Sequence, residues 1–419
     1  MHTHLVDTPP SITTPWWKLL LLTIVSAVIN FGLVLGITQL NVNKPDWAAP
    51  LFEIAAQYNP DQKLPENPYA LREFFFKWDS YYYVDIAQNG YEKQSFDAYK
   101  RHNWAFFPLY PALIRTIAQA TTLPLTPELL LTIGIALSNI FFFLGLLVWK
   151  QLAAVLKMST GQWWTFVLTL LFFPLSYVFH FVFTESLFFF LSSLALLLAI
   201  RQRYITASWI IGLAAITRIT GVVLLPLLMG YYWWNHVRHK SLASEVPFLA
   251  GISIISLTPI WLFLTYLQSI TGELLAPLRI QNAWDNSSSI PFATFIGYFK
   301  DYGLTFQPVH ALSIVLLTGC WALLLYQAIK LSRRPLEETK AYWLLWTFSV
   351  ILVLINSSVN NRSSIFRYTL TVPFLFAIIA QLQASRWHWS WLLPLWIIFI
   401  GLHVLFLAFF LLQIPAYGF

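Results

Sequence analysis

The 419-residue chain is 58% hydrophobic, 18% aromatic and only 10% charged, with a formal net charge of +7. This composition excludes an ordinary soluble globular protein, in which roughly 25% of residues are charged, and predicts an all-α polytopic membrane protein. The basic surplus does not indicate a nucleic-acid partner, because Lys and Arg gather in short loops between apolar runs, as membrane orientation requires. The single Cys320 excludes an intrachain disulfide framework and a cysteine-based metal cluster.

The first apolar run, residues 19–38, has about the length of one membrane span. The residues before it lack a basic signal-peptide region, so we expect a retained signal anchor. Residues 41–128 are predicted to form a large outward loop that contains interfacial helices. Its part 106–120 carries prolines and Arg115, which makes it a poor span and a better interfacial helix, with Arg115 reaching water.

Ten further apolar segments follow, which predicts about eleven transmembrane helices in a single domain over residues 1–419. These segments are 129–149, 163–179, 184–200, 206–217, 219–234, 246–267, 310–330, 342–356, 366–382 and 389–412. The two segments beside Arg218 are too short to cross about 30 Å of hydrocarbon at about 1.5 Å per residue. They predict a helical hairpin with Arg218 at its tip.

The distribution of basic residues predicts the orientation. With the N-terminus in the cytoplasm, the cytoplasmic loops hold most of the loop cations, namely Lys150, Lys157, Arg201, Arg203, Arg238, Lys240, Lys330, Arg333, Arg334, Lys340 and Arg386. The large loop, the Arg218 tip and the segments 268–309 and 357–365 then share the outer face. No sequence repeat of the kind found in many transporters is evident.

Asp79 lies in an aromatic segment that includes Tyr81, Tyr82 and Tyr83. Partial desolvation at a membrane surface favours the neutral carboxyl and would suit a general base. The alternative is a helix cap, because a stretch with helical start and stop signals follows Asp79, and the two roles are compatible. Asp85, six residues on, points to another helical face and is expected to be solvated.

Cations at membrane depth form a second set: Arg218, Arg362 and Arg367. Ionisable groups in apolar surroundings usually face a cavity or a partner, and the arginine fork suits a phosphate. Snorkelling to the interface is the alternative for Arg362, and a role as an anchor at the start of a span is the alternative for Arg367.

Glu185 and the neighbouring His180 lie at a predicted outward turn. Thr184 and Glu185 before an apolar run are also typical of a helix N-terminus, with Thr184 as the cap. His102 is a lone histidine, more often a structural donor than a ligand. Because no tight His/Asp/Glu spacing occurs in the outward segments, no metal or other cofactor is expected to be required.

Together these parts fit transfer of a sugar from a lipid phosphate. The leaving group is already a phosphate, so arginines can stabilise its charge and one carboxylate can deprotonate the acceptor hydroxyl. Glycoside hydrolases normally need a carboxylate pair instead. A flippase for lipid-linked sugars or another secondary transporter is the alternative, and an enzyme that ligates preformed glycans is a third possibility.

The segments WDSYYYVDIAQNGYE and HNWAFFPLYPALIR resemble the PIG-V family, the mannosyltransferases of glycosylphosphatidylinositol assembly and their bacterial relatives. The shared pattern is a W-D pair, then Y-x-x-I-A-x-x-G-Y, then N-W-A-F-F-P. FTESLFFFLS and FRYTLTVPFLF are weaker echoes. The resemblance implies a GT-C-type fold, a polyprenyl-phosphate sugar donor and inversion at the sugar. It assigns Asp79 as the catalytic base and puts six further residues near the donor: Tyr83, His102, Asn103, Glu185, Arg218 and Arg367.

One departure from the wider GT-C pattern is that Ser80 follows Asp79 where many of those families carry a second acid. The resemblance implies transfer of a hexose, mannose by family, to a glycan, glycolipid or protein acceptor. We expect a bacterial plasma membrane, or the endoplasmic reticulum membrane if the chain is eukaryotic, with the active loop outside the cytoplasm.

Overall fold

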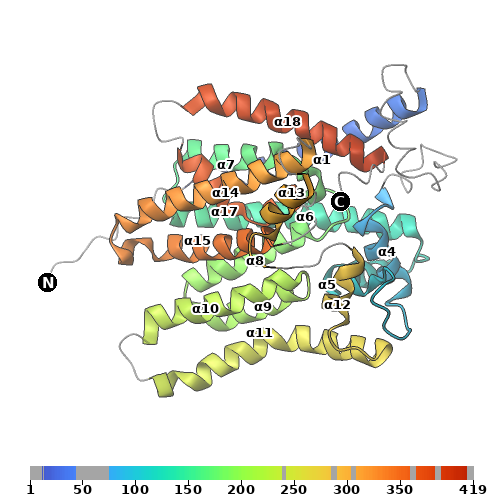
Figure 1. Cartoon of the computed structure of the whole chain (residues 1–419), viewed down its shortest axis with the longest axis horizontal. Helices are drawn as coiled ribbons and strands as arrows, with labels where there is room; N and C mark the ends of the chain where they lie inside the picture. The colour runs from blue at the N-terminus through green and yellow to red at the C-terminus, as the bar shows by residue number, and fades with distance from the viewer. Residues whose placement is uncertain are drawn as a thin grey trace.

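A computed structural model describes residues 12, 14–43, 75–237, 242–284, 290–302, 308–358, 365–382 and 388–412. Every regular element in these ranges is helical, and η marks short 3-10 helices apart from the π-helical η5 (Figure 1). In chain order the elements are α1 (Trp16–Asn43), α4 (Asp79–Asn89), η2 (Asn103–Ala105), α5 (Leu109–Ala120), α6 (Pro127–Val155), α7 (Thr160–Phe172), η3 (Ser176–Phe179), α8 (Glu185–Ile200), α9 (Tyr204–Ala215), η4 (Ile219–Val223), α10 (Leu224–Tyr232), η5 (Trp233–Val237), α11 (Leu242–Thr271), α12 (Ala276–Arg279), η6 (Ile280–Trp284), α13 (Ala293–Tyr302), α14 (Pro308–Ser332), α15 (Leu336–Asn356), α16 (Ile365–Thr369), α17 (Pro373–Leu382) and α18 (His388–Leu412).

Each of the eleven predicted spans overlaps one of these helices. Within the described ranges, five helices are long and apolar enough to cross a membrane: Trp16–Ile37, Pro127–Val155, Ala243–Thr271, Ala311–Ser332 and Leu336–Asn356. Shorter apolar helices are Glu185–Ile200, Tyr204–Ala215, Pro373–Leu382 and Leu392–Ala408. The chain is thus an integral membrane protein that is helical throughout its described elements, and the count of eleven spans stays a prediction.

The helix α8 lies in the middle of the bundle, against α6, α9, α10 and α15. Its sixteen residues are apolar on nearly every side, and such a helix is stable only when other helices surround it. Glu185, the first residue of α8, is consequently buried along with most of the helix. The helices run roughly along one direction, with α11 and α18 on opposite outer edges (Figure 1).

The predicted hairpin around Arg218 is present. The helix α9 ends at Ala215, Arg218 follows in extended backbone, and η4 and α10 lead the chain back. Gly221 lets the two arms meet, because a Cβ on this residue would lie 2.4 Å from the backbone carbon of Ala214. The hairpin turn therefore depends on a position where only a hydrogen fits.

The helices α4 and α5 pack together at one end of the bundle, beside α12 (Figure 1). α5 is a helix of its own, distinct from the predicted spans. It buries one face, formed by Tyr110, Ile114 and Ala118, as expected of an amphipathic helix. Arg115 is partly exposed, in agreement with the expectation that it reaches water, and it also makes a contact that the sequence did not predict. Its Nη1 donates to the carbonyl oxygens of Ala87 and Gln88 at 3.0 and 3.1 Å, and so caps the C-terminal end of α4.

Asp85, expected to be solvated, is partly exposed and also has partners within the protein. This half-buried carboxylate accepts a hydrogen bond from Asn89 at 2.8 Å and another from Asn103 at 3.2 Å. Asp85 therefore fastens the loop that follows α4 to the helix itself.

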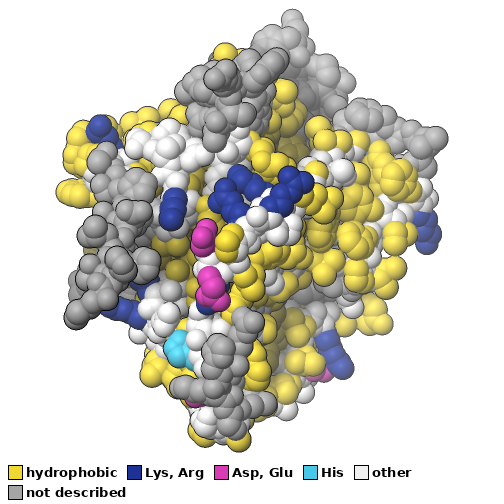
Figure 2. Space-filling view, turned by 90° about the vertical axis from the view of Figure 1, so that its left-hand side faces the viewer, with side chains coloured by type: hydrophobic (Ala, Val, Ile, Leu, Met, Phe, Trp, Pro, Cys, Tyr) yellow, Lys and Arg dark blue, Asp and Glu magenta, His cyan; other side chains and the backbone are white. Residues whose placement is uncertain are grey.

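The opposite end of the bundle is basic. It consists of the turns α6–α7, α8–α9 and α14–α15, and Figure 2 shows Lys and Arg side chains scattered over this end. We call it the basic end; its described cations are Lys150, Lys157, Arg201, Arg203, Lys330, Arg333, Arg334 and Lys340. Arg238, Lys240, Arg386 and Arg362 lie outside the described residues, as do residues 44–74 of the predicted outward loop. The orientation across the membrane stays a prediction.

The contact at Gly221 gives a first test. We expect Gly221→Ala to lower the stability by about 1–3 kcal/mol, because the new methyl group must displace backbone atoms of α9. Thermal unfolding in detergent measures the effect. Gly230→Ala in α10 is the matched control, since nothing lies within 4 Å of its Cβ position. Equal unfolding temperatures for the two variants would contradict the close approach.

Candidate functional site

Four charged side chains, from segments that are far apart in the sequence, form a continuous series of ion pairs. Arg367 donates through Nη2 to Asp79 Oδ2 at 2.5 Å and through Nε to Glu185 Oε1 at 2.5 Å. Arg218 Nη1 donates to the same Glu185 oxygen at 2.6 Å. We call Asp79, Glu185, Arg218 and Arg367 the charge cluster. It holds two cations and two anions, so its formal charge is zero.

Helix ends position both carboxylates. Asp79 is the first residue of α4 and Glu185 the first residue of α8, where the exposed backbone N–H groups favour negative charge. Neither helix has a side-chain cap: Trp78 and Thr184 occupy the cap positions without capping bonds. The predicted start of a helix at Glu185 is confirmed and Thr184 is its N-cap residue, but the Thr184 side chain makes no capping bond. Asp79 occupies the first turn, and its carboxylate contacts an arginine.

The four side chains of the charge cluster differ in their exposure to solvent. Glu185 is 0% and Arg367 5% exposed at the side chain, whereas Asp79 is 20% and Arg218 18% exposed. The guanidinium of Arg367 lies over the Phe183 ring at 4.7 Å. Arg218 lies over Tyr368 at 5.8 Å and donates to the Thr184 hydroxyl at 3.2 Å. A ligand from outside would thus meet Asp79 and Arg218 first.

A sequence model of the family described as "Mannosyltransferase (PIG-V)" matches residues 30–268, more than half of the chain. The chain belongs to this family. The matched region contains Asp79, Glu185 and Arg218 and ends before Arg367, so the last cation of the cluster comes from a part of the chain that the match does not cover. The description of the family names a mannosyltransferase activity.

Two similar proteins place the family match in context. GPI mannosyltransferase 2 of Drosophila melanogaster is 29% identical over 179 residues, which are 41% of this chain and 37% of that protein. The chain therefore matches little more than a third of that relative. An oligosaccharyltransferase, AglB from Archaeoglobus fulgidus, solved with an inhibitory peptide and a dolichol-phosphate, aligns over 88% of this chain and 56% of its own. Its TM-score is 0.45 and its identity 13%, which is too loose to transfer residues or activity.

Tyr83 of this PIG-V protein adjoins the charge cluster. Its hydroxyl lies 3.3 Å from the Thr184 hydroxyl, which in turn accepts from Arg218. The Tyr83 ring packs edge-on against Phe106 and Tyr110. Burial, and secondarily the Asp79 carboxylate, raises the pKa of the Tyr83 phenol well above its usual value. The phenol therefore stays neutral and serves as a hydrogen-bonding group on the wall of the site.

His102 and Asn103 lie in the loop after α4 and make their bonds there. His102 Nδ1 lies 2.5 Å from Glu92 Oε2, and its ring stacks on Trp104 at 4.2 Å. Asn103 donates to Asp85 and to the Gly90 carbonyl, and accepts from the Glu92 backbone. The structure thus brings Asp79, Tyr83, Glu185, Arg218 and Arg367 together, and places His102 and Asn103 in a neighbouring network that holds the loop.

Sequence reasoning missed two contributors. Thr184 had only a capping role, yet its hydroxyl links Tyr83 to Arg218. Buried Lys77 donates to the Leu411 carbonyl at 2.9 Å and so ties the approach to α4 to the end of α18. The one signal in the sequence that could have pointed to these residues is their position: Lys77 lies two residues before Asp79, and Thr184 directly precedes Glu185.

The donor set of the cluster suits anions better than metals. Both carboxylates contact arginines, and no group of three His, Cys, Asp or Glu side chains occurs in the described ranges. The expectation from the sequence that no metal is required stays a prediction.

Removing the central carboxylate tests the cluster. We expect Glu185→Gln to lower the free energy of unfolding by about 3 kcal/mol, because Arg218 would then lose its carboxylate partner and Arg367 would keep Asp79 alone. Glu273→Gln is the matched control. It removes a carboxylate from the Arg279 ion pair, whose arginine side chain is 61% exposed, and should cost at most about 1 kcal/mol. A similar small loss in both variants would contradict a buried, mutually dependent cluster.

Proposed function

We propose that this protein transfers a hexose, mannose by family, from a polyprenyl phosphate to an acceptor hydroxyl at the end of the bundle where α4 begins. The observation that carries the proposal is the charge cluster itself. Two arginines flank one buried carboxylate, and one of them also contacts a partly exposed aspartate.

The proposed reaction is a single displacement. The acceptor oxygen bonds to the anomeric carbon of the sugar as the bond from that carbon to the phosphate oxygen breaks. The hydroxyl proton passes to the Asp79 carboxylate, and polyprenyl phosphate leaves with one more negative charge. Attack opposite the leaving group inverts the anomeric carbon. No redox step and no cofactor are needed for the atoms and charges to balance.

The arginines are suited to the leaving phosphate. A guanidinium offers donors in a fixed fork that matches two phosphate oxygens and keeps its charge at any functional pH. Charge that develops on the phosphate is stabilised most where the donors are already oriented. Glu185 provides that orientation, because its one oxygen Oε1 holds both Arg218 and Arg367 from a fully buried position.

Asp79 is the proposed general base. It is the acidic member of the cluster that is partly exposed, whereas Glu185 is fully buried. Arg367 contacts both carboxylates, so a donor phosphate would compete with Asp79 for its Nη2. Binding of the donor would thus release Asp79 toward the acceptor, which couples occupancy of the donor site to availability of the base.

The remaining assignments rest on the family and the sequence. The donor is proposed to be a lipid-linked sugar within the bilayer, and the acceptor a glycan, glycolipid or protein. The protein is proposed to reside in a bacterial plasma membrane, with the charge cluster on the extracytoplasmic side and the basic end in the cytoplasm.

Replacing the base should remove catalysis and leave donor binding. We expect Asp79→Asn to slow transfer by about 10²–10⁴-fold, because no group then accepts the acceptor proton. Affinity for the donor should stay equal or rise, since Arg367 loses a competing carboxylate. Transfer from a polyprenyl-phosphate mannose, with purified protein in lipid, measures both quantities.

The control for this test is Asp97→Asn, the same substitution in the same loop. Asp97 accepts from the Tyr99 backbone and lies outside the cluster, so transfer should stay near normal. If Asp79→Asn also kept near-normal transfer, Asp79 would not be the base.

Replacing the more accessible arginine should act on donor binding. We expect Arg218→Ala to raise the apparent KM for the donor at least about tenfold, because a charge-assisted bond to phosphate is worth about 1.5–3 kcal/mol. Arg279→Ala removes an exposed arginine that pairs with Glu273 and should leave KM unchanged. An unchanged KM in Arg218→Ala would contradict the phosphate contact.

A further inference from the structure

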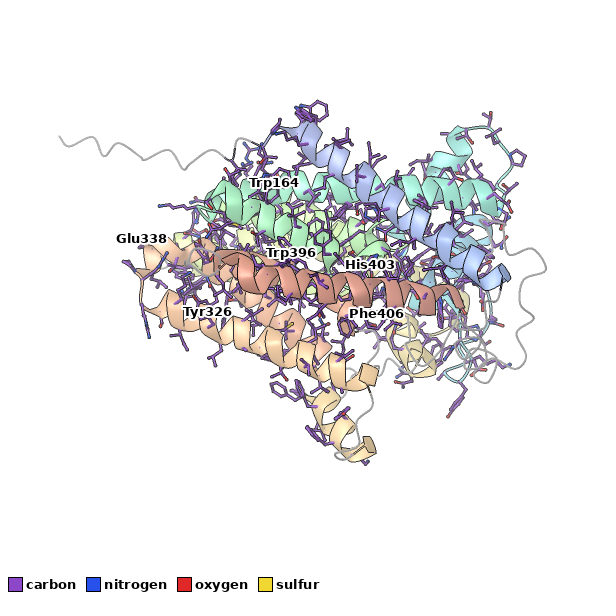
Figure 3. All side chains as sticks on the ribbon, turned by 90° about the horizontal axis from the view of Figure 1, so that it is seen from above. Trp164, Tyr326, Glu338, Trp396, His403 and Phe406 are labelled. Carbon is purple, nitrogen blue, oxygen red and sulfur yellow. The ribbon has the colours of Figure 1, made fainter. Side chains whose placement is uncertain are left out.

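A cavity lies at the basic end, away from the charge cluster. Its volume is about 270 Å³, and the ends of α6, α7, α14, α15 and α17 line it. Glu338, one of its lining residues, is seen at the tip of the α14–α15 pair in Figure 3, with Tyr326 on the adjoining part of α14. The size is close to the lower end of small-molecule sites, about 300 Å³.

Three cations surround this hollow: Lys157, Lys330 and Arg334. None of them has an ion-pair partner in the described part of the chain, and the ammonium of Lys330 lies over the Tyr326 ring at 5.9 Å. Glu338 is the one acid among the lining residues, which leaves a surplus of two positive charges. Orientation in the membrane explains cations anywhere on this end, but it does not explain a basic cavity.

Gln327 supplies an independent observation. It lines the same cavity, is 1% exposed, and its Oε1 has no hydrogen-bond partner. Neighbouring wall groups are satisfied, since the Tyr342 hydroxyl donates to the Leu156 carbonyl and accepts from Gln381 at 3.4 Å. A buried acceptor without a partner is costly, so this position calls for a donor from a ligand or from water.

We propose that this cavity binds a phosphate group that carries a hydroxyl close by, as in glycerol phosphate. The phosphate would lie among Lys157, Lys330 and Arg334, and the hydroxyl would donate to Gln327 Oε1. Two sources share this chemistry, namely the headgroup of an anionic phospholipid and a water-soluble phosphate ester. The site is separate from the proposed reaction and does not depend on it.

The test uses the full-length protein in nanodiscs of phosphatidylcholine. Phosphatidylglycerol, phosphatidic acid and soluble glycerol 3-phosphate are the probes, and binding is followed by native mass spectrometry and by the shift in thermal unfolding. The triple variant Lys157→Ala, Lys330→Ala, Arg334→Ala should lose at least about tenfold in affinity, as expected for three charged contacts to phosphate.

The matched control is Arg201→Ala, Arg203→Ala, Arg333→Ala. It removes the same charge from the same end without touching the cavity lining, and should change affinity by less than about twofold. Binding of phosphatidylglycerol alone assigns the site to a lipid, and binding of glycerol 3-phosphate assigns it to a soluble ester. Binding of neither, or an equal loss in both triple variants, overturns the proposal.

Gln327→Leu tests the hydroxyl separately. The wild-type protein should prefer phosphatidylglycerol to phosphatidic acid by about fivefold, since one hydrogen bond is worth about 1 kcal/mol. Gln327→Leu should abolish this preference and keep the affinity for phosphatidic acid. A wild-type protein that does not distinguish the two lipids, or a variant that still does, overturns the role of Gln327.

Discussion

Glu185 is a fully buried carboxylate whose one oxygen accepts from two arginines, and the arrangement of the whole site follows from that contact. A buried charge is tolerated only when it is paired and hydrogen-bonded. Two guanidinium groups pair with Oε1 of Glu185, whereas its Oε2 is buried without a hydrogen-bond partner in the described residues, and Asp79 in turn balances Arg367. The fold must therefore bring the starts of α4 and α8, the Arg218 turn and α16 to one point. Conversely, loss of one member leaves another buried charge without its partner.

The surrounding helices hold the four segments of the charge cluster together. The central place of α8 buries Glu185, and the close approach at Gly221 fixes the turn that carries Arg218. Arg115 caps α4, and the bond between Asp85 and Asn103 fastens the loop that follows it, so that the helix begun by Asp79 is held at its C-terminal end. The opposite end of the same bundle contains a basic cavity, whose cations are proposed to bind the phosphate of a ligand. Phosphate binding is proposed for both ends, which differ in burial and in their acids.

Sequence reasoning works for features that are local along the chain. Long apolar runs predicted the helices, short runs predicted the hairpin around Arg218, and residue types pointed to Asp79, Glu185, Arg218 and Arg367 one at a time. Their contacts were not predictable, because Asp79 and Arg367 are far apart in sequence and periodicity says nothing of such pairs. The contacts of Arg115 and Asp85 with other segments were not predicted for the same reason. Arg115 donates to carbonyl oxygens of α4, and Asp85 accepts from Asn103 in the following loop as well as from Asn89 of its own helix.

The central claim is that the charge cluster is the seat of the leaving phosphate. A structure of the protein in nanodiscs with bound polyprenyl phosphate tests it most directly. The account predicts the phosphate within hydrogen-bond distance of both Arg218 and Arg367, with the contact between Arg367 and Asp79 broken and that between Arg367 and Glu185 kept. A phosphate bound elsewhere, with the Asp79–Arg367 ion pair intact, would contradict it.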